Sequence, residues 1–184
     1  TMHAQRLDAV LLTHEHKDHI GGLDEVRSFN FKQGEAMNIY AYERVINRLK
    51  IEYAYAFEEI KYPGVPNLEV HPIDKEPFEI QGIPIIPIEV LHYKLPVLGF
   101  RFQDFTYITD AKTIAPEELE KIEGSKVLVL NGLQKAPHIS HLTLQEAIDV
   151  VHSLKQRPEI TYLTHISHTP VSYTHLRAHE TVLD

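Results

Sequence analysis

Hydrophobic residues occur in short runs along this chain, and polar turns separate the runs. Apolar or alternating runs of about four to eight residues are typical of β-strands. One run contains Pro84 and Pro87, and because proline cannot donate to a strand ladder, we expect that strand to lie at a sheet edge or to be irregular. Strands are predicted at 7–12, 37–41, 78–80, 83–91, 99–103, 105–109, 127–130 and 160–164.

Segments with helical spacing lie between these runs. Thr143 and Glu146 have the spacing of a capping box at the start of a helix. The aromatic segment 53–57 is either a lid that faces a substrate or apolar packing under a loop, and packing is favoured because aromatic side chains usually carry burial. Strands that alternate with helices predict an α/β protein, and 184 residues suit one domain. Helices are predicted from 23, over 43–49, from 115 and over 144–154.

Four side chains that can bind metals follow the first predicted strand within six residues: His14, His16, Asp18 and His19. Residues two apart in an extended backbone point to the same side, so His14 and His16 can hold one ion. Asp18 and His19 come where the chain begins to turn, and they can face a second ion. The alternative is a polar loop with histidines that have no such role, but this spacing after a strand favours a metal site.

Three further candidate residues follow other predicted strands. His92 ends the run 83–91, Asp110 follows 105–109 and His165 follows 160–164. Each has a structural alternative. Either histidine can be a satisfied core residue, and Asp110 can cap the helix that is predicted from 115. His141 lies ahead of the helix over 144–154, where backbone N–H groups favour a phosphate, or it only assists the cap of that helix.

The motif His14-x-His16-x-Asp18-His19 resembles the signature of the metallo-β-lactamase superfamily of di-metal hydrolases. The surrounding residues 11–22 look most like the phosphodiesterase branch, which includes the cyclic phosphodiesterase of phosphonate breakdown and ribonuclease Z, the tRNA 3′-processing enzyme. The resemblance runs from about 7 to 168 and implies a four-layer αββα sandwich. Because only 7–13 precedes the motif where the family has several strands, it also implies a domain, 1–168, that is incomplete at both ends. Residues 169–184 resemble a foreign tail, and we expect weak order there.

The resemblance implies two divalent ions and a complete ligand set. A hydroxide that bridges the ions would attack the substrate. The resemblance also implies that Asp18 is a catalytic residue as well as a metal ligand. The β-lactam-cleaving branch usually has a cysteine at the position of Asp110, so antibiotic hydrolysis is not expected. Zinc is the first choice for ligation by three histidines, with manganese or iron as alternatives. His14, His16 and His92 would hold one ion, Asp18, His19 and His165 the other, with Asp110 between them.

The resemblance also suggests a proton donor. His141-x-Thr143 resembles the family element that supplies a general acid to the leaving oxygen, and His138 is a weaker candidate. The tRNA-processing branch orients this histidine with a glutamate on the preceding strand, whereas this chain has Asn131 at about that place. An acid–histidine relay is therefore not expected here.

Composition limits the partners. The formal net charge of −8 argues against a broad nucleic-acid surface, although RNA bound through a local basic patch remains open. The absence of cysteine leaves only nitrogen and oxygen ligands for a metal. No run is long enough to span a membrane, and a cytoplasmic location and a homodimer are expectations by default.

These observations predict a binuclear metallohydrolase, with a phosphodiesterase that acts on a small or cyclic phosphodiester as the main hypothesis. One alternative is a thioester hydrolase of the glyoxalase II type, which shares the ligand set but does not need His141. The other is a truncated fragment that binds metal without catalysis.

Overall fold

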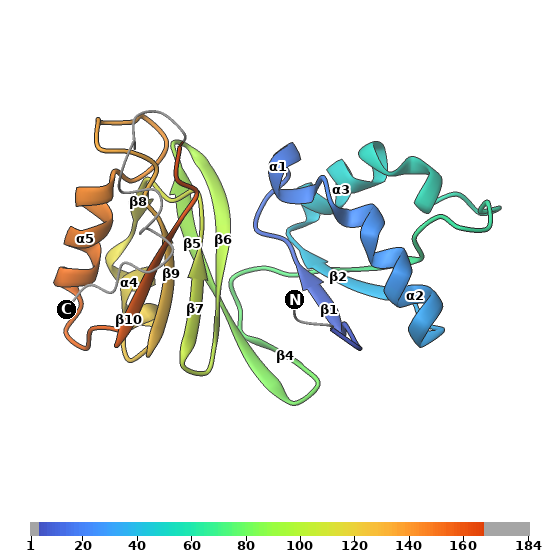
Figure 1. Cartoon of the computed structure of the whole chain (residues 1–184), viewed down its shortest axis with the longest axis horizontal. Helices are drawn as coiled ribbons and strands as arrows, with labels where there is room; N and C mark the ends of the chain where they lie inside the picture. Colours follow the sequence, from blue (N-terminus) through green and yellow to red (C-terminus); the bar gives the residue numbers. More distant parts are fainter. Residues whose placement is uncertain (1–3, 168–184) are drawn as a thin grey trace. The chain divides into compact units, whose positions relative to one another are not determined.

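The computed structural model describes residues 4–167, and the chain divides after Asp74 into two compact units (Figure 1). The expected weak order of 169–184 lies outside the described residues, as do His3 and His168. Within 4–167, no helix is long and apolar enough to cross a membrane. Each unit contains its own sheet and its own hydrophobic core, which confirms the α/β class.

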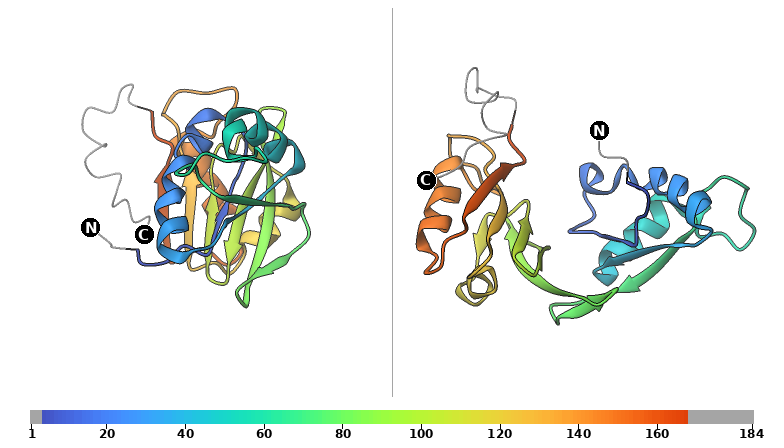
Figure 2. Two further views of the ribbon diagram at one scale, coloured as in Figure 1. Left: turned by 90° about the vertical axis from the view of Figure 1, so that its right-hand side faces the viewer. Right: turned by 60° about the horizontal axis from the view of Figure 1, so that its bottom comes forward.

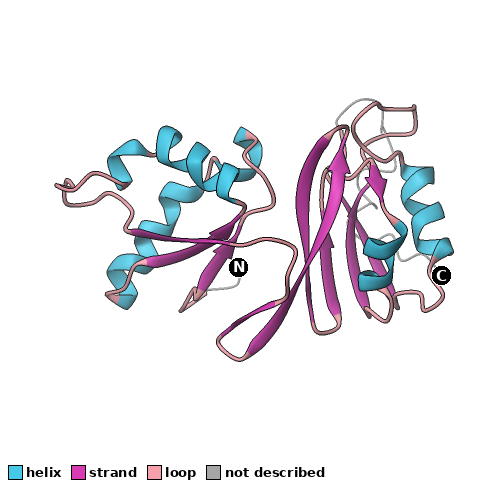
Figure 3. Cartoon of the chain, turned by 180° about the vertical axis from the view of Figure 1, so that it is seen from behind, coloured by secondary structure: helices cyan, strands magenta, loops and turns pink. Residues whose placement is uncertain are grey.

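The first unit contains a parallel sheet of three strands in the order β1-β2-β3 (Figure 3). The helix predicted from 23 begins there as a 3-10 turn that continues into α2, and a separate short helix, α1, which carries Asp18 and His19, precedes it. The strands are β1 (Ala9–Leu11), β2 (Met37–Ala41) and β3 (Leu68–Pro72). The helices are α1 (Lys17–Ile20), α2 (Arg27–Gln33) and α3 (Glu43–Glu52), with the 3-10 turns η1 (Leu23–Val26) and η2 (Ala54–Ala56).

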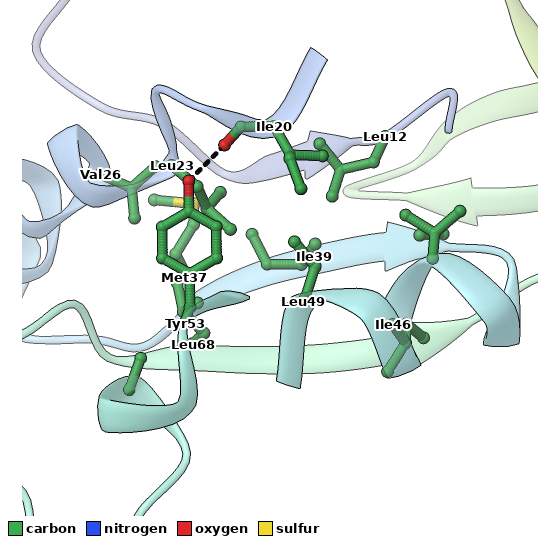
Figure 4. Close-up of a cluster of buried hydrophobic side chains, with 13 residues drawn as sticks. Leu12, Ile20, Leu23, Val26, Met37, Ile39, Ile46, Leu49, Tyr53 and Leu68 are labelled. Carbon is green, nitrogen blue, oxygen red and sulfur yellow. Dashed lines mark hydrogen bonds between the residues drawn. The ribbon is translucent and has the colours of Figure 1, made fainter. Parts of the chain in front are cut away.

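The core of the first unit joins α3 to the sheet. Ile46 and Leu49 of α3 are buried together with Ile39 of β2 (Figure 4). Burial of each such side chain contributes roughly 1.5–3 kcal/mol. Tyr53 is 3% exposed, and its hydroxyl donates to the carbonyl oxygen of Ile20 at 2.6 Å. The interpretation of segment 53–57 as packing is therefore confirmed at its first residue, which ties η2 to the end of α1.

The second unit contains a mixed sheet in the order β10-β9-β7-β6-β5-β4, with β8 paired to β5 (Figure 2). Helices α4 and α5 bury Ile122 and Val151 in the same core as Leu128 of the sheet. The strands are β4 (Phe78–Ile80), β5 (Ile83–His92), β6 (Leu95–Phe102), β7 (Phe105–Ile108), β8 (Thr113–Ile114), β9 (Val127–Asn131) and β10 (Ile160–Thr164). The helices are α4 (Pro116–Ile122) and α5 (Leu144–Ser153).

The two prolines of β5 predicted either an edge strand or an irregular one, and the structure has the irregular one. β5 is interior, but its ladder is interrupted on the side away from β6, because β4 pairs with it only up to Ile85 and β8 only from Val90. Pro87 faces this gap, where its carbonyl accepts from Lys121 Nζ at 3.0 Å. The N–H of Glu89 faces the same gap and donates to Glu118 Oε2 at 2.9 Å. Side chains of α4 thus replace a neighbouring strand where proline has no N–H to offer.

The register of the second sheet brings three strand ends to one edge. β7 and β10 each run parallel to β9, and β5 is antiparallel to β6, which is itself antiparallel to β7. The carboxyl ends of β5, β7 and β10 therefore meet at the same edge of the sheet. The residues that end or follow these strands include His92, Asp110 and His165.

Candidate metal centre

The first unit brings together the histidines of the sequence motif in the loop that leaves β1. His14 Nε2 lies 3.0 Å from His16 Nδ1, and the rings of His14 and His19 have centroids 4.2 Å apart. Two nitrogen ligands at 2.0–2.1 Å from a tetrahedral ion lie about 3.3–3.4 Å apart. The spacing of the His14 and His16 nitrogens is therefore close to what one ion requires.

Thr13 orients the His14 ring through the ring nitrogen that does not face His16. His14 is fully buried, and its Nδ1 lies 3.0 Å from the hydroxyl of Thr13. With a proton on Nδ1 donated to that hydroxyl, the Nε2 lone pair faces His16, which is how ligating histidines are usually held.

Asp18 and His19 lie together on the single turn of α1. Asp18 Oδ2 is 3.3 Å from His19 Nε2, and the Asp18 side chain is exposed, whereas His19 is largely covered. A carboxylate and an imidazole side by side supply the oxygen and nitrogen ligands that a second, more oxygen-rich ion would take.

The second unit brings Asp110, His141 and His165 together, with one ligand atom of each within 4.8 Å of the others. Asp110 is 2% exposed. Its Oδ1 lies 3.3 Å from His165 Nδ1, whereas its Oδ2 lies 3.4 Å from His141 Nε2. The hydroxyl of Thr109 also donates to Oδ1 at 2.7 Å. The two carboxylate oxygens thus face different partners.

His92 reaches the same edge of the sheet from β5. Its Nδ1 lies 2.9 Å from the carbonyl oxygen of Ser140. Because a carbonyl can only accept, Nδ1 carries a proton, and in the neutral ring the lone pair is then on Nε2. The His92 ring lies edge-on to His141, with centroids 4.5 Å apart. A ring nitrogen bonded to a backbone carbonyl is the usual support of a metal-ligating histidine.

The backbone is strained where these strands end. Asp110 and His165 have φ angles of 57° and 55°, and Tyr93, which follows His92, has 58°. Left-handed backbone costs a non-glycine residue roughly 1–2 kcal/mol. Such conformations persist where the surrounding structure enforces them, and they concentrate at functional sites. Tyr93 lies in the two-residue turn between β5 and β6, where left-handed backbone is usual, so Asp110 and His165 are the two residues whose backbone supports a functional role for this edge.

Asn131 has a role that the sequence did not reveal. Its buried amide accepts from the N–H of Ala111 at 2.8 Å and donates to the carbonyl of the same residue at 3.0 Å. Asn131 therefore fixes the backbone directly after Asp110 and is not part of an acid relay to His141. The only available signal was a polar residue at the end of an apolar strand.

Two structural alternatives are wrong. Asp110 does not cap α4, whose N-cap is Ala115. His141 does not cap α5, whose predicted capping box of Thr143 and Glu146 is confirmed.

Polar groups surround His141. Its Nδ1 lies 3.0 Å from Ser140 Oγ and 3.1 Å from His138 Nδ1. Burial, together with repulsion from His141 and Lys112, lowers the pKa of His138. A neutral His138 can accept a hydrogen bond from His141 Nδ1, and it remains the weaker candidate for proton transfer because His141 is the one that faces Asp110.

The predicted ligands therefore fall into two groups, one in each unit. His14, His16, Asp18 and His19 belong to the first, and His92, Asp110 and His165 to the second. That the two groups form one binuclear centre stays a prediction.

Comparison with known proteins identifies the family. Residues 2–166 match the model of the beta-lactamase superfamily domain. The chain belongs to the beta-lactamase superfamily. The family prediction is confirmed, and within this superfamily the group of Asp110, His141 and His165 is consistent with divalent metal binding.

Three known proteins are similar to this chain. A crystal structure of a diphosphatase from the PhnP family is 34% identical, with a TM-score of 0.80 over 90% of this chain and 62% of that one. The short form of human tRNase Z (ELAC1) is 13% identical, with a TM-score of 0.63 over 87% of this chain and 72% of that one, which shows a shared fold. A protein of Porphyromonas gingivalis named octanoyltransferase is 37% identical over 173 residues, which cover 92% of this chain. Those residues span only 34% of the Porphyromonas protein.

Proposed function

We propose that this chain is a metal-dependent hydrolase that cleaves a phosphodiester or diphosphate bond in a small molecule. The observation that carries the proposal is Asp110, with one carboxylate oxygen facing His165 and the other facing His141, in a member of a superfamily of hydrolases. Similarity to a PhnP-family diphosphatase supports phosphorus chemistry, and it extends the expected substrates from phosphodiesters to diphosphates.

The donor set fits divalent ions. It consists of imidazole nitrogens and carboxylate oxygens, and the chain has no cysteine to offer a thiolate. We assign His14, His16 and His92 to one ion, Asp18, His19 and His165 to the other, and Asp110 to both. Zinc is the first choice, with manganese and iron as alternatives. When bound, such ions lower the pKa of water towards neutrality and stabilise negative charge on phosphoryl oxygens.

His141 is the proposed proton donor. The oxygen of water forms a bond to phosphorus and loses a proton to bulk water, the bond from phosphorus to the leaving oxygen breaks, and His141 Nε2 gives a proton to that oxygen and then regains one from bulk water. Ser140 and His138 hold the opposite ring nitrogen, Nδ1, at 3.0 and 3.1 Å. General acid catalysis of this kind contributes about 10²- to 10⁴-fold in rate.

Hydrolysis assays on the full chain test the proposal. Bis-p-nitrophenyl phosphate, a cyclic nucleotide and ADP-ribose would be supplied with zinc, manganese or iron. We expect turnover of at least one of them, and a fall of at least about 100-fold for His141→Ala. The control is His152→Ala, which changes an exposed histidine on α5. Absence of turnover with every metal would refute the proposal.

The thioester alternative can be separated in the same experiment. A glyoxalase II substrate, S-lactoylglutathione, is added to the panel. Because His141 has no role in thioester cleavage under that hypothesis, full thioesterase activity in His141→Ala would favour it. Metal content without any turnover would favour a fragment that only binds metal.

A further inference from the structure

A pocket of about 500 Å³ lies in the first unit beside the metal motif. One wall comes from the loop after β1 and the start of α1, with Glu15, His16 and Lys17. The facing wall is α3, with Arg44 and Arg48. The proposed metal chemistry uses His16 but leaves the other charged residues unexplained.

The spacing along α3 directs its cations to this pocket. Asn47 and Arg48 follow Arg44 by three and four residues, so both lie on the same side of the helix as Arg44. Val45 and Leu49, which belong to the core, are fully buried. The polar face of α3 is therefore set by the same periodicity that builds the core.

Positive charge dominates the pocket. Its walls contain three cationic side chains and a single carboxylate, whereas the whole chain has a net charge of −8. Both oxygens of Glu15 accept from Arg44 Nη1, at 2.7 and 2.8 Å. Lys17 and Arg48 both pair with Glu52, which lies outside the pocket walls. Glu15 and Glu52 thus hold the three cations in place and offset two of their three charges, and the remaining positive charge suits an anionic ligand.

We propose that this pocket binds a phosphate group of the substrate other than the one that is attacked, and so selects diphosphate esters over simple phosphodiesters. This inference rests on the proposed function. His16, a proposed ligand, lines the pocket, so a substrate phosphorus at the metal would have its neighbouring phosphate near the arginines. Guanidinium groups match the geometry of phosphate oxygens better than ammonium groups do.

The pocket volume favours a small molecule over RNA. Sites for small ligands measure about 300–1,000 Å³, which includes this pocket. An RNA strand would need a longer basic track, and the acidic chain as a whole does not favour one.

Kinetics and binding on the full chain test the inference. The Arg48→Ala variant should raise the KM for ADP-ribose at least about tenfold more than the KM for bis-p-nitrophenyl phosphate, which has no second phosphate. Arg48→Lys, which keeps the charge but not the guanidinium, should fall between Arg48→Ala and wild type. Lys50→Ala removes an exposed cation from α3 outside the pocket and is the matched control.

A second measurement does not depend on turnover. Binding of inorganic pyrophosphate is followed by calorimetry in the presence of a chelator, and Arg48→Ala should weaken it at least about tenfold. Equal pyrophosphate affinity and equal KM ratios in wild type and Arg48→Ala would overturn the inference, even if both enzymes hydrolyse the substrates. If Arg48→Ala impaired only the cleavage of single-stranded RNA, the inference would be overturned, and the pocket would be assigned to RNA binding. These outcomes differ from a failure of the proposed function itself, in which wild type would hydrolyse neither substrate.

Discussion

The amide of Asn131 binds both backbone polar groups of Ala111, at 2.8 and 3.0 Å. Ala111 directly follows Asp110, which lies in left-handed backbone with a φ of 57°. A strained residue keeps its conformation only if its neighbours are fixed. Asn131 thus connects the end of β9 to the orientation of the carboxylate at the centre of the second group of ligands.

Replacement of Asn131 by aspartate tests this connection. Aspartate has nearly the same shape, but an ionised carboxylate cannot donate to the carbonyl of Ala111. We expect Asn131→Asp to lower the free energy of unfolding by about 1–3 kcal/mol, the usual cost of an unpaired buried polar group. Metal affinity should fall as well, because Asp110 loses its support. Urea unfolding and metal titration measure the two effects, and wild-type values for both would show that the contact is dispensable.

Tyr53 allows a comparison of two tyrosine hydroxyls in the first unit. The buried hydroxyl of Tyr53 donates to Ile20 at 2.6 Å, whereas that of Tyr55, which is 38% exposed, donates to Asp24 at 2.6 Å. Tyr53→Phe leaves a buried carbonyl without its donor and should cost about 1–3 kcal/mol in unfolding free energy. Tyr55→Phe is the control, with an expected change within about 0.5 kcal/mol. Equal effects in thermal unfolding would contradict the role assigned to burial.

Sequence reasoning located most candidate ligands because their signals are local. Asp110 and His165 each follow a predicted strand directly, so a residue-by-residue pattern could identify them. The contact between Asn131 and Ala111 depends on the pairing of strands β7 and β9, which are 19 residues or more apart in sequence. No short pattern contains that pairing.

Pro87 shows the same limit for the fold. Proline in a strand correctly predicted a missing ladder bond, but not that Lys121 and Glu118 of α4 would occupy the gap. An edge position is the simplest place for a residue that has no N–H to donate. In the structure the strand is interior, and side chains of α4 take the place of the missing neighbour. Tertiary contacts of this kind are not encoded in local spacing.

Glu146 provides a prediction about pH. Its pKa lies below the ordinary 4.5, mainly because Lys112 donates to its carboxylate and also because the N–H of Thr143 does. A carboxyl with a lowered pKa in the folded state stabilises the protein above its unfolded pKa, and this contribution is lost as the pH falls through the folded pKa. Wild type should therefore exceed Glu146→Gln in stability at pH 7, and the difference should shrink below pH 4.5.

The expected size of this difference is small. The Glu146 side chain is 42% exposed, so solvent screens its pairing with Lys112, and about 1 kcal/mol or less is expected at pH 7. Urea unfolding at several pH values measures it. A difference that grows on acidification would mean that the sign is wrong and that Glu146 is not held as a carboxylate.

Removal of one proposed ligand tests the first group directly. His16→Ala deletes a nitrogen that lies 3.0 Å from His14 Nε2 and so leaves His14 without its partner for a shared ion. We expect the dissociation constant for zinc to rise at least tenfold, since loss of even an outer supporting contact costs about 10- to 100-fold. Competition with a chromophoric chelator measures it without any substrate. His71→Ala is the control, because His71 bonds to Asn38 and stacks on Tyr40, away from the motif. Should both variants bind zinc as wild type does, the histidines of the motif would not be ligands, and the proposed chemistry would have no metal to act through.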